Sequence, residues 1–467
     1  MTGLRHAGPP LQPHGHRGAL AIAADVLEGR SGAGEAVETA CARIATLNGT
    51  LNAFVDFDPE VTGSQVIALE RRLASGEKPA LAGVPVAIKD HIMVAGWRYT
   101  EGSRLFADRY AADDDPVVAR LRVAGAILVG RTNMSEFGCK GVTSNALYGS
   151  TRHPVDPTLT PGGSSGGAAV AVAAGMVPLA LASDGGGSVR RPAAHVGVVG
   201  AKPSTGMIAD PRGFSHTSVF GVIAGNVADA AAMLSAIAGP CAADPVALPA
   251  AAFTGGEFRR PRVAWAPTLG LDVAVDDDIA EDVAGAVARL GAAGWHVERA
   301  DPIWPVGADE EALMPLQHAA LAAAYGARWR SDPELFDADI GRQIVAGLAL
   351  SGAHVAQAQA LSLSIARTAA TFFARGFDAL LCPTVPCAPW PHVQLDPILI
   401  GGRAAMLRGH AVFTPFFNHA FCPAVSLPVP RAPGRLPAGL QIAGPRLSDA
   451  SILRLAAGAE AILQAPA

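Results

Sequence analysis

A serine that follows three glycines is the first residue in this sequence whose surroundings favour chemistry. The stretch "LASDGGGSVRRPAAH", residues 181–195, contains Ser188. Glycine lets backbone N–H groups come close to another molecule, and those of Gly185, Gly186, Gly187 and Ser188 could converge on a developing oxyanion. The cluster follows a predicted buried strand, where α/β proteins place their sites. The same residues equally fit a tight turn with Arg190 as a surface charge, so both interpretations stay open here.

A second glycine–serine cluster, "GGSSGG", occupies residues 162–167. It contains the pattern G-x-S-x-G, which marks a nucleophilic serine only where it directly follows a strand. The turn sequence "DPTLTP" precedes it here, so that interpretation fails. A phosphate-binding loop stays open because the cluster begins a helix, although no G-x-x-x-x-G-K-[ST] motif is present. A flexible surface loop is the remaining interpretation.

A serine nucleophile needs a base, and Lys89 is the candidate that its position favours. It lies at the end of a predicted buried strand over residues 84–88. Burial would lower the pKa of its ammonium group by up to ~3–5 units and leave a neutral amine near pH 7. An ion pair with Asp90, or a side chain that reaches water, is the other interpretation. Three histidines near the motifs are interpreted as structural or rim residues: His91, His153 and His195.

Taken together, three motifs resemble the amidase signature family of serine hydrolases. They are "KDH" at 89–91, "PGGSSGG" at 161–167 and "SDGGGSVRRPA" at 183–193. Stretches like "GRTNMSEF", "YGSTRHPVDP" and "GVVGAKPSTG" also belong to the family pattern, and all occur here in order. The similarity is dense over a motif-bearing core of about residues 82–239. It returns weakly in "LLCPTVP", "FTPFFNHAFCPAVSLPVP" and "GLQIAGP".

The resemblance implies a Ser–Ser–Lys triad. Ser188 would be the nucleophile, Lys89 the base, and Ser164, after a cis peptide bond, the bridge between them. The N–H groups of residues 185–188 would hold the oxyanion, and the reaction would pass through an acyl-enzyme with no metal and no organic cofactor.

Further residues are expected to shape the substrate pocket. Candidate substrate contacts are Ser165, Met134 and Arg191. Arg190 is expected to pair with Asp184 inside the protein, which leaves Arg191 to face the substrate and bind a carboxylate through two hydrogen bonds. Residues from about 310 to 410 are expected to supply much of the pocket.

Three positions depart from the usual family pattern. The pair His195-Val196 stands where Phe-Cys is common, His153 replaces a frequent Asn, and Gly185 takes a position often filled by Thr or Ile. None belongs to the implied triad, so we expect them to change the shape of the pocket and not the chemistry.

The elements that must position these residues alternate between strand and helix, which indicates α/β layering. The resemblance implies one large domain over residues 19–467, with a mixed, twisted central sheet covered by helices on both faces. Residues 1–18, which lack the apolar run of a signal peptide, are expected to form a flexible tail, and residues 239–261 an internal crossing. Helices are predicted over 20–47 with a break near Gly32, over 64–74, from Pro116 onward with Asp115 as the N-cap, over 168–175 and over much of 310–374. Strands are predicted over 84–88, 126–130 and 177–183.

The composition excludes several classes of partner. Of the 467 residues, 50% are apolar and 16% charged, and the net charge is -5, so we expect a large core and no nucleic-acid ligand. No Lys/Arg cluster suggests an anionic membrane, and the most apolar stretch, 168–183, falls short of the ~20 residues of a membrane span. The six cysteines form no C-x-x-C pair and no zinc spacing, which indicates reduced thiols in a cytoplasmic protein.

We therefore expect an amidase that cleaves a small-molecule linear amide, with a homodimer left open. The alternative is the A-type subunit of a tRNA-dependent amidotransferase, which shares these motifs and works with partner chains. Such subunits usually carry a Ser-x-Asp-Gln-like stretch after the nucleophile, and "GFSHTSVFGVIAG" at 213–225 lacks Asp-Gln. A non-catalytic binding protein on the same fold is a third interpretation, against which the complete triad argues.

Overall fold

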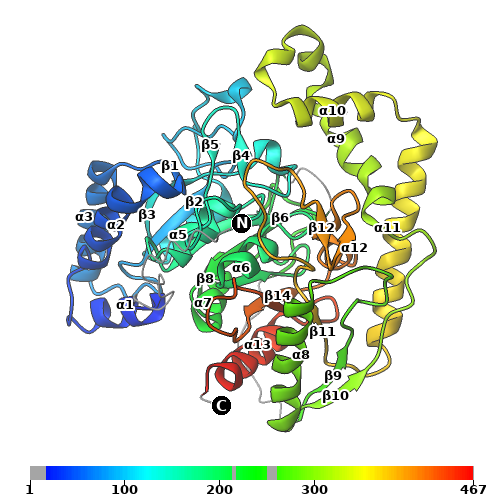
Figure 1. The fold of residues 1–467 in the computed structure, drawn as a ribbon. Coiled ribbons are helices and arrows are strands. Elements are labelled where there is room, and N and C mark those ends of the chain that lie inside the picture. The colour runs from blue at the N-terminus through cyan, green and yellow to red at the C-terminus, as the bar shows by residue number, and fades with distance from the viewer. Residues whose placement is uncertain (1–16, 213–216, 250–259, 466–467) are drawn as a thin grey trace, which may run out of the picture.

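The computed structural model describes residues 17–212, 217–249 and 260–465, and a single mixed sheet forms its centre (Figure 1). Within these residues the sheet has 11 strands, in the order β1-β3-β2-β6-β8-β7-β14-β15-β11-β9-β10. Neighbouring strands are parallel from β3 to β6 and from β11 to β10, and antiparallel elsewhere. The predicted α/β class with one large mixed sheet is confirmed.

The strands of this sheet are β1 (Phe54–Asp56), β2 (Pro85–Lys89), β3 (Ile127–Thr132), β6 (Leu179–Asp184), β7 (Val199–Lys202), β8 (Val219–Ala224), β9 (Arg262–Trp265), β10 (His296–Arg299), β11 (Ala379–Pro383), β14 (Ala424–Pro428) and β15 (Gly439–Ala443). Two short hairpins lie outside it, β4 (Ser144–Asn145) with β5 (Gly149–Ser150) and β12 (Leu399–Ile400) with β13 (Arg403–Ala404).

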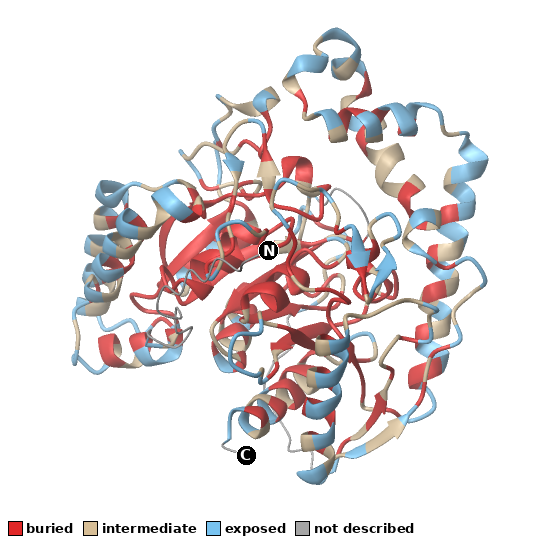
Figure 2. Cartoon of the chain, viewed as in Figure 1, coloured by how far each residue is buried: buried red, intermediate tan, exposed pale blue. Residues whose placement is uncertain are grey.

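Helices cover both faces of the sheet, because successive side chains of a strand point to opposite sides. In β2, Val86 and Ile88 join one core cluster and Ala87 joins another. The first cluster is completed by α4, α7, α8 and α13, and the second by α2, α3, α5 and α6. Buried strands accordingly lie between helices whose outer sides are exposed (Figure 2).

The helices are α1 (Ala19–Leu27), α2 (Glu35–Leu51), α3 (Pro59–Ala74), α4 (Pro116–Val123), α5 (Gly166–Ala173), α6 (Arg190–Val196), α7 (Val227–Ile237), α8 (Asp277–Ala292), α9 (Glu310–Ser331), α10 (Ala338–Leu348), α11 (Gly352–Phe373), α12 (Pro415–His419) and α13 (Asp449–Gln464).

Most helix ends agree with the sequence, and two local expectations change. The break near Gly32 is confirmed by the gap between α1 and α2. Helix α3 begins at Pro59, earlier than predicted, because the Asp58 carboxylate accepts hydrogen bonds from the first turn. Helix α4 begins at Pro116 as predicted, but the Asp115 carboxylate does not cap it and pairs with Arg212 instead.

Parallel pairing brings two strand ends to one edge of the sheet. Strand β2 lies beside β6 with Ile88 opposite Leu181. Lys89 therefore ends β2 next to the point where Asp184 ends β6 and the glycine-rich turn begins. This is the edge at which the site residues were expected.

A helical arm of α9, α10 and α11 extends along one side of the sheet (Figure 1), which agrees with the predicted helical region 310–374. In the described ranges, no single helix is long and apolar enough to cross a membrane; only α10 and α11 taken together, bent by 104° at their junction, pass that test by length and composition. Of the predicted tail, residues 1–16 lie outside the described residues, as do 250–259 of the predicted crossing.

Removing a buried side chain of β6 should destabilise the protein strongly. Leu181 is 0% exposed, so Leu181→Ala should lower the free energy of unfolding by about 2–5 kcal/mol. Urea unfolding followed by circular dichroism measures it. The matched variant Leu407→Ala removes a side chain that is 65% exposed and should change stability by less than about 1 kcal/mol. Equal losses in both variants would contradict the assigned core.

Candidate active site

Lys89 is sealed in the interior and hydrogen-bonded to two serine hydroxyls. Its Nζ lies 2.8 Å from Ser164 Oγ and 3.1 Å from Ser183 Oγ, and the side chain is 0% exposed. Burial lowers the pKa of the amine to about 7; the Arg191 charge adds to this, while Asp184 and Cys139 oppose it. A substantial fraction of the amine is therefore neutral near pH 7.

Asp90 does not neutralise this lysine, so that interpretation of the sequence is wrong. Its carboxylate pairs with Arg131 and accepts hydrogen bonds from the Thr100 hydroxyl and the Gly102 N–H. The alternative that Lys89 reaches water is wrong as well, because the side chain is fully buried.

The "GGSSGG" segment is a buried loop, not a surface loop. Ser164 is 1% exposed and follows a cis peptide bond from Gly163, as the resemblance implied. The Thr143 hydroxyl holds the loop by donating to Gly162 O and accepting from Gly166 N–H. At Gly163, a Cβ atom would meet the Val142 backbone at 2.8 Å, so the close approach requires glycine.

Ser188 follows the glycine-rich turn and lies beside the Ser164 loop. Both serines line the same cavity, Ser188 is 6% exposed, and the Ser165 N–H donates to the Ser188 carbonyl at 3.3 Å. In the part of the chain that the structure describes, no hydrogen bond joins the hydroxyls of Ser164 and Ser188. The hydroxyl of Ser188 is thus next to the cavity while that of Ser164 is engaged by Lys89.

The backbone N–H groups of the turn fall into two sets. The Gly187 N–H donates to Asp184 Oδ1 at 2.7 Å, which removes it from the expected oxyanion donors. Within the described residues, the N–H groups of Gly185, Gly186 and Ser188 donate to no protein acceptor. These three remain free to bind an oxygen in the cavity.

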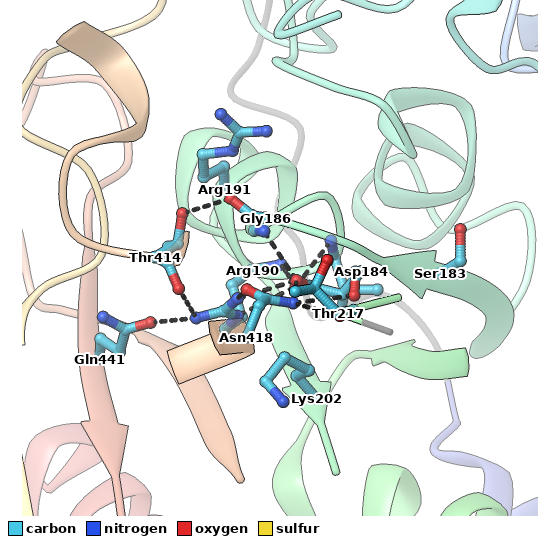
Figure 3. Close-up of polar contacts among 12 residues, drawn as sticks. Ser183, Asp184, Gly186, Arg190, Arg191, Lys202, Thr217, Thr414, Asn418 and Gln441 are labelled. Atoms are coloured by element: carbon cyan, nitrogen blue, oxygen red, sulfur yellow. Dashed lines mark hydrogen bonds and ion pairs between the residues drawn. The ribbon is translucent and has the colours of Figure 1, made fainter. Parts of the chain in front are cut away.

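A buried ion pair fixes this turn from behind. Arg190 contacts Asp184 through Nη2 to Oδ1 at 2.8 Å and Nε to Oδ2 at 3.0 Å, and both side chains are 0% exposed. Arg190 also donates to Gln441, Asn418 and the Thr414 carbonyl (Figure 3). Burial alone would raise the pKa of Asp184, but the Arg190 guanidinium outweighs it and holds that pKa well below its usual range. The expected Arg190–Asp184 pair is confirmed, and the surface-charge interpretation of Arg190 is wrong.

The cavity beside the serines has a volume of about 340 Å³. Met134 lines it as expected, whereas Ser165 does not: its hydroxyl donates to the Ser183 carbonyl at 3.2 Å. The expectation for residues 310–410 is confirmed, since this range supplies Glu310, Leu313, Met314, Leu316, Gln317, Tyr325 and Arg408 to the lining.

Comparison with known proteins now identifies the family. A family model described as Amidase matches residues 35–453. A bacterial aryl acylamidase of the amidase signature family superposes with a TM-score of 0.89 at 28% identity, over 96% of both chains. The chain belongs to the amidase signature family.

Two curated amidase signature relatives are similar over nearly their whole length. An acylamidase from Rhodococcus erythropolis is 36% identical over 458 residues, which cover 95% of each chain. The A-type subunit of the glutamyl-tRNA(Gln) amidotransferase from Azoarcus sp. (strain BH72) is 34% identical over 452 residues, covering 89% of this chain and 91% of the relative. The chain is thus an amidase signature hydrolase whose relatives include both types of enzyme weighed from the sequence.

The three histidines near the motifs are placed differently from one another. His153 is buried, with its ring bonded to the His195 carbonyl at 2.9 Å and to backbone N–H groups, so it is structural. His195 is buried and, among the described residues, neither ring nitrogen has a hydrogen-bond partner. His91 lines the cavity, but burial lowers its pKa well below the ordinary value.

Sequence reasoning missed several residues of this amidase signature site. Ser183, the second partner of Lys89, could have been suspected from its place one residue before Asp184. The aromatic wall of Phe137 stacked on Tyr325, with centroids 4.1 Å apart, joins segments far apart in the chain, and no sequence signal connects them. The same holds for the Glu310–Arg408 ion pair at the cavity.

Breaking the ion pair behind the turn should destabilise the protein. Arg190→Met leaves the Asp184 carboxylate buried without its cation, which should cost about 3–5 kcal/mol. The control Arg435→Met removes an arginine that pairs with Glu281 and Asp282 nearer the surface and should cost less than about 1 kcal/mol. Urea unfolding measures the loss of stability in both variants. Similar losses in Arg190→Met and Arg435→Met would show that the buried ion pair contributes no more than the exposed one.

Proposed function

We propose that this protein hydrolyses the C–N bond of a small linear amide, with Ser188 as nucleophile, Ser164 as proton relay and Lys89 as base. The observation that carries the proposal is the 2.8 Å contact between Lys89 Nζ and Ser164 Oγ at a cavity that Ser188 also lines. A neutral amine is a competent base near pH 7, and burial lowers the pKa of Lys89 to about 7.

The proposed reaction begins with two linked proton transfers. Ser188 Oγ attacks the amide carbonyl carbon as its proton passes to Ser164 and the Ser164 proton passes to Lys89. The negative charge on the carbonyl oxygen is held by the free N–H groups of Gly185, Gly186 and Ser188; one such donor is worth ~2.7–4 kcal/mol in other enzymes. The tetrahedral intermediate then collapses, the C–N bond breaks, and Lys89 returns its proton through Ser164 to the leaving amine.

Water then hydrolyses the resulting acyl-enzyme, with Ser164 and Lys89 again transferring the protons. Water loses a proton to Ser164 and Lys89 while its oxygen attacks the ester carbonyl. The second tetrahedral intermediate releases the carboxylic acid, and the proton returns to Ser188 Oγ. Atoms and protons balance without a metal or organic cofactor.

An apolar or aromatic substituent on the amide is supported by two observations. The Phe137–Tyr325 wall offers an aromatic surface at the cavity, and relatives named acylamidase and aryl acylamidase are similar over nearly the whole chain. We also propose a reducing, cytoplasmic setting, because all six cysteines are free.

A second candidate is an amidotransferase A-type subunit that works with partner chains and tRNA. The 34% identity to one such protein over most of the chain favours it, and the missing Asp-Gln in 213–225 argues against it. Turnover of simple amides by the purified chain alone supports the free-standing amidase. Turnover of glutamine only together with partner chains and charged tRNA would support the alternative.

Replacing the proposed nucleophile should abolish covalent labelling and turnover together. Ser188→Ala should not react with a fluorophosphonate probe and should lose amide hydrolysis, because the proposed acyl-enzyme forms on the Ser188 hydroxyl. Ser164→Ala and Lys89→Met should slow labelling by about 10²–10⁴-fold. Intact-protein mass spectrometry measures the adduct, with Ser235→Ala on α7 as the control. A labelled Ser188→Ala protein would overturn the assignment.

The pH profile should report the Lys89 amine. Its pKa is lowered to about 7, so the base is neutral above that pH and protonated below it. The value of kcat/KM should therefore fall about tenfold per pH unit below pH 7. In the control Lys202→Met, which removes another buried lysine, the acidic limb should keep its position. A profile that stays flat from pH 5 to 9 would refute Lys89 as the base.

A further inference from the structure

One cavity-lining arginine lacks the ion pair that the others have. Three arginines line the cavity: Arg212 pairs with Asp115 and Arg408 pairs with Glu310 at 2.8 Å. For Arg191, no salt bridge to any described carboxylate exists, and the nearby Asp184 is already occupied by Arg190. Arg191 is the cationic group of the lining whose charge is not balanced by a described carboxylate.

Arg191 is also deeply buried, at 2% exposure. Its Nη2 donates to the Gly163 carbonyl at 3.3 Å, while Nε and Nη1 have no hydrogen-bond partner among the described residues. Burial and, to a smaller extent, the Arg408 charge lower the pKa of this guanidinium to about 10, while Glu310 opposes the shift, so the group still carries its charge at neutral pH. A buried charge whose N–H donors lack acceptors is energetically costly unless an anion binds to it. The Arg191 guanidinium therefore indicates an anionic ligand.

The position of the guanidinium places such an anion next to the reacting atoms. Nη2 bonds to the residue before Ser164, and a Cβ atom on Gly187, the residue before Ser188, would lie 3.0 Å from Nε. The Arg191 side chain points away from the Asp184–Arg190 cluster (Figure 3). The Arg191 side chain therefore lies on the cavity side of the turn, while that of Arg190 lies on the core side.

Helix α9 lines the cavity and brings an aromatic ring to it, beside the Glu101 carboxylate that accepts a hydrogen bond from the Tyr325 hydroxyl at 3.3 Å. Its first residue, Glu310, holds Arg408, whereas Tyr325, about 22 Å further along the helix axis, stacks on Phe137. A Cβ atom on Gly138, the residue after Phe137, would lie 3.4 Å from Ser164 Oγ. The Phe137–Gly138 segment thus lies against the Ser164 hydroxyl, and the Arg191 guanidinium lies against the preceding residue, Gly163.

We propose that Arg191 is a carboxylate subsite, and that the substrate is an amide with a carboxylate on one side of the scissile bond and an apolar or aromatic group on the other. This inference rests on the proposed amide hydrolysis. A carboxylate matches the planar guanidinium donors and supplies the missing counter-charge.

Two matched pairs of amides test the proposal. Succinanilic acid carries the carboxylate on the acyl side, and 4-methylpentananilide is its neutral counterpart. N-benzoylglycine carries it on the amine side, and N-isobutylbenzamide is its neutral counterpart. We expect the wild-type enzyme to show at least a tenfold higher kcat/KM for the acid in one pair, and that pair tells which side of the bond meets Arg191.

The variant Arg191→Met should lower this acid-to-neutral ratio at least tenfold, chiefly through KM for the acid. The control Arg431→Met removes a buried arginine paired with Asp278 and Asp282 elsewhere, and should leave the ratio within twofold. A wild-type preference for the neutral member of both pairs overturns the proposal. An equal loss on acid and neutral substrates in Arg191→Met also overturns it, since that would mark a positioning role.

Binding measurements test the carboxylate subsite even if Arg191→Met does not fold or no amide is turned over. Calorimetry on Ser188→Ala should show at least tenfold tighter binding of the acid than of the neutral amide in one pair, and equal affinities in both pairs would refute the subsite. If wild-type protein binds the acids but cleaves no amide, the proposed hydrolysis fails and the carboxylate subsite stands.

Discussion

The hydrogen bond between the Lys89 amine and the Ser164 hydroxyl is the interaction on which the rest of the site depends. Lys89 ends β2, an interior strand of the sheet, is buried away from water, and in the described residues has no carboxylate partner. Desolvation therefore lowers its pKa to about 7, and the surrounding loops bring hydroxyls to it. A lysine paired with Asp90 would stay protonated; the capture of Asp90 by Arg131 prevents this.

The two adjacent arginines, Arg190 and Arg191, lie on opposite sides of the glycine-rich turn and make different contacts. Arg190 faces the core, where Asp184, Asn418 and Gln441 surround it (Figure 3), and fixes the turn that ends in Ser188. Arg191 faces the cavity with its charge unbalanced by any described carboxylate. The same turn thus carries an arginine that fixes it to the core, an arginine whose charge an anionic substrate can balance, and the free N–H groups of Gly185, Gly186 and Ser188.

Local sequence patterns predicted the strands, the turn and the proposed triad residues. They did not predict the contacts between segments that are far apart in the chain. The end of a buried strand at Lys89 and the strand before Asp184 follow from alternation and apolar runs, and the motifs singled out Ser164 and Ser188. The strand register that puts Ser183 beside Lys89 does not follow from either strand alone. Nor does the sequence pair Phe137 with Tyr325 or Arg190 with Gln441, because these contacts depend on packing between distant segments. A surface loop was one interpretation of residues 162–167, because the segments that bury this loop come from elsewhere in the chain and are not evident from its own sequence.

The most direct measurement is the protonation state of Lys89 itself. The chain contains four lysines, Lys78, Lys89, Lys140 and Lys202, so selective isotope labelling of lysine side chains gives four signals in an NMR titration. The signal that disappears in Lys89→Met identifies the group. We predict that this signal titrates near pH 7. A Lys89 signal that stays protonated to pH 10 or above would contradict the proposed role, because a charged amine could not accept the serine proton.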